Sequence, residues 1–162
     1  MSKQKADKAQ PGADFVVCRN PKAQHDYEIE EKLEAGLVLQ GSEVKSLRAR
    51  RADLEGSYAG IDHNELFLHG MHVAPYEQAG AFGHEPKRVR KLLVHRQEIK
   101  RLLGKLSLRG YTLVPLSVYF KQGRAKVELG LGRGKKRGDH REDVRREIDL
   151  REAREAMQRR RR

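Results

Sequence analysis

Few residues in this chain have the types and spacing that catalysis requires. His25 and Asp26 are neighbours, as a general base and its orienting carboxylate would be. Adjacent residues of a strand face opposite ways, however, and no serine or cysteine nucleophile is indicated nearby. His69 and His72 are three residues apart on a predicted strand, which places them on opposite faces and poorly for a shared metal ion. These histidines are better explained as surface or half-buried residues.

The single cysteine and one glycine-rich run complete the candidates for chemistry. Cys18 precedes Arg19, whose charge would lower the thiol pKa, but a lone thiol is better explained as structural. The run GLGRGKK from Gly130 resembles a phosphate-binding loop, yet its first glycine would fall at Leu129, and Lys136 stands where Ser or Thr should hold magnesium. We interpret the run as a flexible basic hinge. We therefore expect no enzyme activity, no catalytic or metal-binding residues and no cofactor.

Basic side chains are far more prominent than candidates for catalysis. The 162 residues include 35 Lys and Arg against 23 Asp and Glu, which gives a formal charge of +12 and a pI of about 10.0. Clustered cations gain affinity for RNA or DNA by neutralising phosphates and releasing counterions. The clusters are Arg19 and Lys22; Lys45, Arg48, Arg50 and Arg51; residues 87–91; Arg96, Lys100 and Arg101; residues 133–137; and residues 159–162. Each alone is typical of a solvated surface, but together they favour a nucleic-acid partner, without distinguishing RNA from DNA.

Composition also excludes other classes of protein. With one cysteine, the chain cannot form an internal disulfide or a cysteine-rich zinc site. No stretch approaches the roughly 20 apolar residues that span a bilayer. Residues 1–14 are polar and lack the apolar region of a signal peptide. We therefore expect a soluble cytoplasmic protein with no membrane partner.

The segments that must position the basic clusters are mostly strands. Apolar residues alternate with charged ones over residues 27–39, which predicts a long strand with a bulge or bend at Gly36. Two hairpins are predicted, with turns at residues 62–64 and 121–123. Pro115, in the second hairpin, indicates an edge position or a bulge.

Helices are fewer than strands. Ser42 is the candidate N-cap of a short helix. Residues 97–108 carry apolar side chains at helical spacing and predict the clearest helix. A short strand is expected over residues 91–94 and a loop over residues 74–86.

The predicted fold is mainly β, with about six short strands and two or three helices. Hairpin spacing and glycine bends suggest a small antiparallel β-barrel that resembles an OB-fold. We predict a disordered basic arm over residues 1–14, an RNA-binding core over residues 15–132 and a basic tail over residues 133–162. The tail holds 13 basic and 7 acidic residues and only a thin apolar stripe, so we expect it to be disordered when free and helical against a polyanion.

Four stretches together resemble the small protein B family, whose members are also called SsrA-binding proteins. The stretches are NPKAQHDYEIE from Asn20, EAGLVLQGSEVKSLRA from Glu34, RKLLVH from Arg90, and GYTLVPLSVY from Gly110, which runs on to KVELG and GKK. The resemblance extends from about Cys18 to the end of the chain. It implies an OB-like barrel that binds the tRNA-like domain of transfer-messenger RNA and substitutes for its missing anticodon half.

The implied activity is ribosome rescue by trans-translation. The protein and its RNA would enter stalled ribosomes together with elongation factor Tu. The tail would then become helical in the empty mRNA channel, at the decoding centre of the small-subunit ribosomal RNA. Translation would resume on the RNA's own reading frame and tag the incomplete protein for degradation.

Site residues follow from the same resemblance. The residues implied to bind RNA are Asn20, Lys22, His25, Glu34, Lys91, Leu93 and His95. The tail residues implied to act on the ribosome are Lys135, Lys136, Asp139, His140 and Arg141. Glu34 would accept hydrogen bonds from sugar hydroxyls or base amines, or orient a nearby arginine, since a carboxylate does not bind phosphate.

Two departures from the family pattern affect these expectations. Arg50 stands where glycine is common, and an arginine would strain a turn that needs positive φ. Gly138 stands where many relatives have a histidine, so His140 is the candidate for that decoding-centre contact. The alternatives are a constitutive ribosomal or assembly protein bound to ribosomal RNA, and an enzyme that acts on RNA, for which the chain offers no convincing site.

Overall fold

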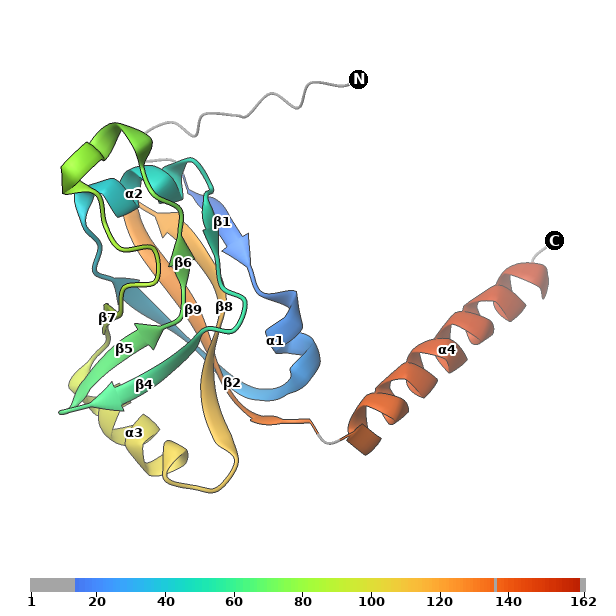
Figure 1. Ribbon diagram of the computed structural model, residues 1–162. Helices are drawn as coiled ribbons and strands as arrows, with labels where there is room; N and C mark the ends of the chain where they lie inside the picture. Colours follow the sequence, from blue (N-terminus) through green and yellow to red (C-terminus); the bar gives the residue numbers. More distant parts are fainter. Residues whose placement is uncertain (1–13, 136, 161–162) are drawn as a thin grey trace, which may run out of the picture.

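The computed structural model describes residues 14–135 and 137–160, without the side chains of residues 81–82, 137–143 and 160. Within these ranges a β-rich core is followed by a long helix that stands clear of it (Figure 1). The strands are β1 (Phe15–Arg19), β2 (Tyr27–Leu37), β3 (Ala52–Asp53), β4 (Tyr58–Asp62), β5 (Glu65–His69), β6 (His72–Val73), β7 (Arg90–Leu93), β8 (Tyr111–Lys121) and β9 (Arg124–Gly134). The helices are α1 (Pro21–Asp26), α2 (Gly41–Arg48), the 3-10 helix η1 (Glu77–Phe82), α3 (Arg96–Leu106) and α4 (Arg137–Arg160).

The main sheet closes on itself. Its antiparallel strands follow the order β1-β8-β4-β5-β7-β2-β9, and β9 also pairs with β8 along its whole length. The strands β8, β4, β5, β7, β2 and β9 therefore form a ring, in which the link from β4 to β8 is short and rests on the pair Ala59 and Leu113. The predicted antiparallel, β-rich fold with a few helices is confirmed. The likeness to an OB-fold in particular remains a prediction.

Aliphatic side chains fill the inside of this ring. Successive residues of a strand point to opposite faces, so alternate positions of β2 and β9 enter the core and the residues between them face outward. The buried set includes Leu33, Ala35 and Leu37 of β2 and Val127, Leu129 and Leu131 of β9. Leu47 of α2 and Leu102 of α3 join the same core and are fully buried, which holds both helices against the barrel.

The bulge of β2 lies around Glu30. At Gly36, where a bulge or bend is predicted, β2 and β9 pair without a register shift, so a bulge there was wrong. Around Glu30 the register of β2 against β9 shifts by one residue, which brings the backbone of the two strands close together. A Cβ at Gly132 would lie 2.2 Å from the carbonyl oxygen of Glu28. Because the obstacle is backbone, only glycine fits opposite this bulge.

Both predicted hairpins are present. His63 and Asn64 join β4 to β5 with positive φ angles of 48° and 61°, and Gln122 and Gly123 join β8 to β9. The register of β8 against β9 shifts after Pro115, which confirms the bulge predicted there. β9 continues through the GLGRGKK run as far as its fifth residue, so most of that run is strand, and the prediction of a flexible hinge was wrong.

The two predicted core helices are present with shifted ends. α3 begins at Arg96 and buries Ile99 and Leu102 on one face. Gln40, not Ser42, is the N-cap of α2, and its backbone N–H donates to the Glu43 carboxylate at 2.8 Å. Ser42 lies inside the helix, and its hydroxyl is 2.8 Å from the Nδ1 of His84.

The tail forms one long helix. Every side chain described between residues 144 and 159 is exposed, including the apolar Val144, Ile148 and Met157. Over residues 144–159, α4 therefore buries no apolar face against the core. Its helical form is the one predicted for the tail against a polyanion, and disorder of the free tail stays a prediction.

Candidate nucleic-acid interface

The buried side chain of Asn20 positions α1. Its Oδ1 accepts a hydrogen bond from the backbone N–H of Ala23 at 3.3 Å, which caps the helix. Its Nδ2 donates to the carbonyl oxygens of Pro115 at 3.0 Å and Leu54 at 3.4 Å. Asn20 is only 6% exposed, and these bonds fix α1 on β8. The direct RNA contact implied by the sequence stays a prediction.

Lys22 and His25 lie on the exposed surface of α1. The Lys22 ammonium is 3.5 Å from the Glu55 carboxylate, and both side chains are largely exposed. Such a pair contributes less than about 1 kcal/mol, so Lys22 can exchange Glu55 for a phosphate. His25 Nδ1 is 3.1 Å from Asp26 Oδ1. These two side chains meet because they lie in a helical turn, whereas the sequence prediction placed them on opposite faces of a strand.

A groove runs beside Leu93 at the end of β7. Leu93 is 55% exposed, and it faces Gly36 of β2, where a Cβ would lie 3.2 Å from the Leu93 Cβ. The groove is lined by apolar residues and two cations, among them Leu39, Val44, Phe120, Arg124 and Lys126. An apolar floor with cations at its edge suits a base or sugar together with its phosphate.

Glu34 lies two residues before Gly36, on the same outward face of β2. Its carboxylate accepts a hydrogen bond from the Tyr119 hydroxyl and lies 3.7 Å from the Lys121 ammonium. Burial raises the pKa of Tyr119, and the hydrogen bond and negative charge of Glu34 raise it further. The phenol therefore keeps its proton and holds the Glu34 carboxylate in one orientation, with acceptor positions left for a ligand.

The other two predicted contacts flank the groove. The Lys91 ammonium is 2.9 Å from the Glu65 carboxylate, and both side chains are about half exposed. His95 is exposed directly before α3, and its backbone N–H donates to the Glu98 carboxylate at 3.3 Å. Both residues are accessible to a ligand at the Leu93 end of the barrel.

The predicted RNA-binding residues thus lie in two places. Lys22 and His25 precede the start of β2, whereas Glu34 and Leu93 lie at its other end. A strand rises about 3.3 Å per residue, so roughly 23 Å of strand lies between Tyr27, close after His25, and Glu34. Sequence reasoning missed Tyr119, Arg124 and Lys126 as members of the second group, because strand register across β8, β9 and β2 brings them there.

The tail residues are described only in part. The backbone N–H of Lys135 donates to the carbonyl oxygen of Asp26 at 2.8 Å, so the chain leaves the barrel beside α1 and two residues later than the predicted boundary. Lys136 lies outside the described residues. The side chains of Asp139, His140 and Arg141 do too, although their backbone belongs to α4. The roles predicted for these residues therefore stay predictions.

The other residues considered for catalysis or metal binding, His69, His72 and Cys18, lie in surroundings that do not favour either role. The His69 ring stacks on Tyr58 with 5.0 Å between centroids, and His72 lies on β6 in a different sheet. Burial and the charge of Asp53 raise the pKa of Cys18 to about 11, so the expected lowering by Arg19 is wrong. A thiol with this pKa is protonated and unreactive at neutral pH.

Two of the predicted surface cations are instead part of a buried network. Glu43 and Arg90 are fully buried, and the Arg90 Nε donates to Glu43 at 2.9 Å. Arg88 donates to both carboxylate oxygens of Glu43, at 3.1 and 2.8 Å. Arg90 also donates to the carbonyl oxygens of Met71 and Pro86. The network joins α2 to the segment that leads into β7, and the available signal was that Glu43 shares the apolar helix face of Leu47.

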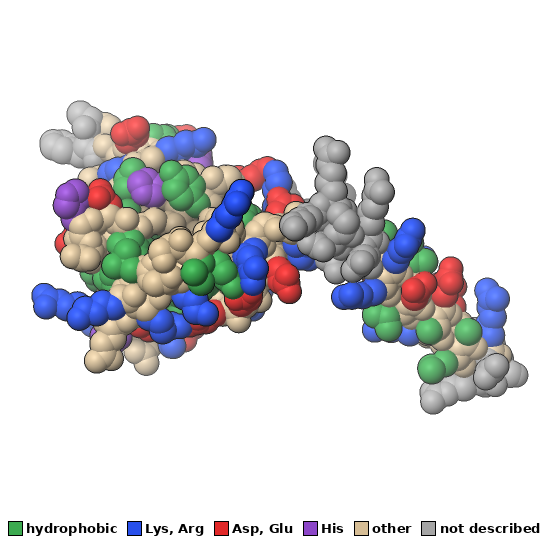
Figure 2. All heavy atoms as spheres, turned by 90° about the horizontal axis from the view of Figure 1, so that it is seen from below, with side chains coloured by type: hydrophobic (Ala, Val, Ile, Leu, Met, Phe, Trp, Pro, Cys, Tyr) green, Lys and Arg blue, Asp and Glu red, His purple; other side chains and the backbone are tan. Residues whose placement is uncertain are grey.

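Charge on the exposed surface is mixed. Seen from the α3 side, basic and acidic side chains are interspersed over the core and along α4 (Figure 2). Among the described helices, none is both long and apolar enough to cross a membrane.

Comparison with known proteins assigns this arrangement to a family. The family model described as SmpB protein matches residues 17–159. The chain is 52% identical over 149 residues to the SsrA-binding protein of Geobacillus thermodenitrificans, covering 92% of this chain and 96% of the relative. It is 53% identical over 146 residues to that of Bacillus subtilis (90% and 94%) and 57% identical over 145 residues to that of Chloroflexus aurantiacus (89% and 91%).

A solved structure agrees with the sequence relatives. One chain of the structure described as "tmRNA-SmpB: a journey to the center of the bacterial ribosome" superposes with a TM-score of 0.64 at 50% identity. The match covers 80% of this chain and 94% of that chain. The family model spans both the barrel and most of the tail, and the relatives match over nearly their whole length. This protein belongs to the SmpB family of SsrA-binding proteins.

Proposed function

We propose that this protein binds the tRNA-like domain of transfer-messenger RNA and delivers it to stalled ribosomes for trans-translation. The observation that carries the proposal is the match to SsrA-binding proteins over barrel and tail together, with 52% of the aligned residues identical in one relative. The protein acts as an RNA-binding adaptor and not as an enzyme, and it works in the cytoplasm, where ribosomes translate.

The barrel supplies the RNA-binding surfaces. At one end, the Leu93 groove offers an apolar contact edged by Arg124 and Lys126, and Glu34 offers oriented acceptors. At the other end, Lys22 and His25 offer a cation and a ring beside the tail exit. Phosphate contacts supply affinity, whereas the groove and Glu34 discriminate by shape and hydrogen bonding.

The tail acts after RNA binding. Residues 144–159 of α4 bury no apolar face on the core, so this part of the helix is available to the ribosomal RNA of the mRNA channel and decoding centre. Residues 133–162 carry a net charge of +6, which suits a channel lined by phosphates. Lys135, Lys136, Asp139, His140 and Arg141 are the proposed contacts there. Elongation factor Tu is the proposed companion during delivery.

A gel-shift competition at physiological salt tests the proposal. The labelled RNA is the tRNA-like domain of transfer-messenger RNA, and the controls are an ordinary tRNA and a DNA duplex of similar length. Selective binding to the first in the presence of excess tRNA supports the proposed function. Equal binding to all three would mean that net charge alone acts, which would favour a constitutive protein bound to ribosomal RNA.

A further inference from the structure

Three cations at the α2 end of the barrel each lie over an aromatic ring. Measured to the ring centroid, Lys45 lies over Tyr76 at 5.1 Å, Arg48 over Phe120 at 5.7 Å and Arg50 over Phe15 at 5.4 Å. The rings of Phe15 and Phe120 also stack on each other at 5.1 Å. A stacked cation keeps its N–H groups directed outward in a restricted set of orientations. We name Lys45, Arg48 and Arg50 the stacked-cation patch.

Arg50 has a left-handed backbone conformation, which arginine rarely adopts. The N–H of Arg50 bonds to the carbonyl of Leu47, and the N–H of Arg51 bonds to the carbonyl of Ser46. These two bonds form a Schellman motif at the end of α2, and Arg50 stands at its left-handed position with φ 57°. Glycine is the usual residue there because it has no Cβ to strain. An arginine at this position strains the backbone, and the contact that it gains is the stack on Phe15, which holds the guanidinium at the surface, where it can bind an anion.

The patch also lacks neutralising acids. Arg88, Arg90, Arg101 and Arg133 all form ion pairs with glutamates. Within residues 14–135 and 137–160, Lys45, Arg48 and Arg50 make no ion pair at 4.0 Å or less, although their side chains are exposed. Unpaired, oriented cations on one surface are arranged for an anionic partner.

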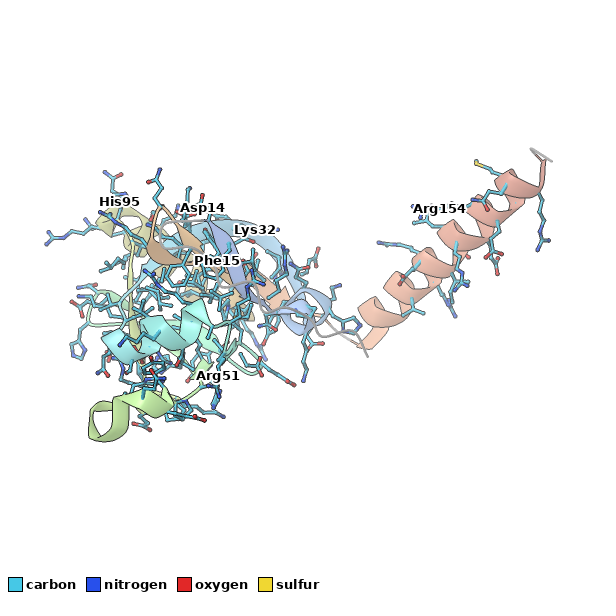
Figure 3. All side chains as sticks on the ribbon, turned by 90° about the horizontal axis from the view of Figure 1, so that it is seen from above. Asp14, Phe15, Lys32, Arg51, His95 and Arg154 are labelled. Carbon is cyan, nitrogen blue, oxygen red and sulfur yellow. The ribbon has the colours of Figure 1, made fainter. Side chains whose placement is uncertain are left out.

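The position of the stacked-cation patch on the barrel indicates which anionic partner it binds. Phe120, under Arg48, also lines the groove of Leu93, so the patch continues that RNA-binding surface. The patch lies near the Arg124 end of β9, whereas the tail leaves the other end (Figure 1). Figure 3 shows the labelled Phe15 and Arg51 in the barrel part of the molecule, far from Arg154 on α4. We propose that the stacked-cation patch binds the phosphodiester backbone of the tRNA-like RNA, with Arg50 as its specific contact; this rests on the proposed function.

Three single variants of the full-length protein test this proposal. Arg50→Gln removes the charge and keeps the strained backbone, whereas Arg50→Gly removes both. Arg109→Gln is the matched control, because Arg109 is also exposed but follows α3, at the opposite end of the barrel from α2 (Figure 1). For each, the affinity for the tRNA-like domain is measured over a range of salt concentrations, together with affinity for vacant small ribosomal subunits and the Tm.

The expected result separates binding from stability. Both Arg50 variants weaken binding of the tRNA-like domain by up to about fivefold, the size of one exposed charge contact. They also reduce the slope of log affinity against log salt by about 0.7 to 1. Arg50→Gly has a Tm about 2 to 4 °C above that of Arg50→Gln, because both variants lose the stack on Phe15 and only glycine relieves the strain. Arg109→Gln changes neither affinity nor slope.

Other results would overturn the proposal. If Arg50→Gly kept the wild-type salt slope, Arg50 would make no phosphate contact. If the Tm of Arg50→Gly fell below that of Arg50→Gln, Arg50 would not be strained and its role would be structural. Loss of affinity only for the small subunit would assign the patch to ribosomal RNA. In each of these cases wild-type selectivity for the tRNA-like domain is retained, so the proposed function stands. If the wild-type protein itself does not prefer that RNA, the proposed function is the part that fails.

Discussion

The hydroxyl of Tyr119 on β8 donates to the carboxylate of Glu34 on β2, across the intervening strand β9. The bond spans two strand spacings on the outer face of the barrel. It gives a surface carboxylate a fixed orientation beside the groove of Leu93. A charge that would otherwise repel RNA is thereby turned into an oriented hydrogen-bond acceptor.

Removing the Tyr119 hydroxyl is expected to weaken RNA binding through Glu34. Tyr119→Phe should reduce affinity for the tRNA-like domain by about fivefold, close to the worth of one hydrogen bond. Glu34→Gln should reduce it at least as much. A double-mutant cycle measured by gel shift should show that the two losses are not additive, since both act on one group. Fully additive losses would mean that Tyr119 does not act through Glu34.

Tyr119 also predicts a loss of stability at alkaline pH. Its pKa is raised above the ordinary value of 10.0, chiefly by burial and then by Glu34. From about pH 10 upward the unfolded chain releases this proton and the folded chain retains it, so the free energy of unfolding decreases. Denaturant melts between pH 9 and 11 should show a steeper decrease for wild type than for Tyr119→Phe. Equal slopes for the two proteins would contradict the assigned shift.

The buried Glu43 predicts a large effect on stability. Glu43→Gln leaves Arg88 and Arg90 without their counter-charge, and Arg90 has no exposed surface. We expect a loss of about 3 kcal/mol in the free energy of unfolding, measured with urea. Glu65→Gln, which removes the exposed partner of Lys91, is the matched control and should cost less than about 1 kcal/mol. Similar losses in the two variants would argue against a buried network.

The same carboxylate predicts a contribution to acid unfolding. Burial by itself raises the pKa of Glu43, but hydrogen bonds from Arg88 and Gln40 and the charges of Arg90 and Arg88 outweigh it, and the pKa is lowered. The stabilisation is present above the ordinary pKa of 4.5 and is lost as pH falls through the folded-state value. In melts from pH 6 to pH 3, the stability difference between wild type and Glu43→Gln should therefore shrink. A constant difference would contradict ionisation of Glu43 in the folded protein.

Local patterns in the sequence predicted most of the elements. Alternation predicted β2, β8 and β9, and the spacing of Ile99 and Leu102 predicted α3, because both signals come from one buried face. The two-residue strand β3 left no such signal, and β6 was merged with β5 in one predicted strand. The bulge was misplaced from Glu30 to Gly36 because a glycine in a strand does not reveal whether it faces a bulge or a neighbouring side chain.

The sequence predicted the residues of the candidate site less well than it predicted the fold. Exposure of Leu93 and burial of Asn20 depend on strand pairing and packing, which short motifs do not encode. Arg88 and Arg90 were grouped with surface cations because their partner Glu43 is more than forty residues away along the chain. The positive φ at Arg50, in contrast, agrees with the strain expected for an arginine at that position.

Two neighbouring glycines of β9 give a matched pair of substitutions. Gly132→Ala should lower the free energy of unfolding by about 3 kcal/mol, because the new Cβ would lie 2.2 Å from the Glu28 carbonyl oxygen and backbone must move. Gly134→Ala meets no atom within 4 Å and should be nearly neutral. Thermal melts of both variants provide the comparison. A tolerated alanine at Gly132 would show that the bulge around Glu30 is not formed as described.

The central claim is that the barrel binds transfer-messenger RNA and that the tail is needed only afterwards. The most direct measurement is tagging in a reconstituted translation system programmed with a message lacking a stop codon, with RNA binding measured in parallel. The full-length protein and a form ending at Arg137 are compared. We predict that both bind the tRNA-like domain with similar affinity and that only the full-length protein supports tagging. Loss of RNA binding in the shortened form, or tagging by it at the full-length rate, would contradict this division of labour between barrel and tail.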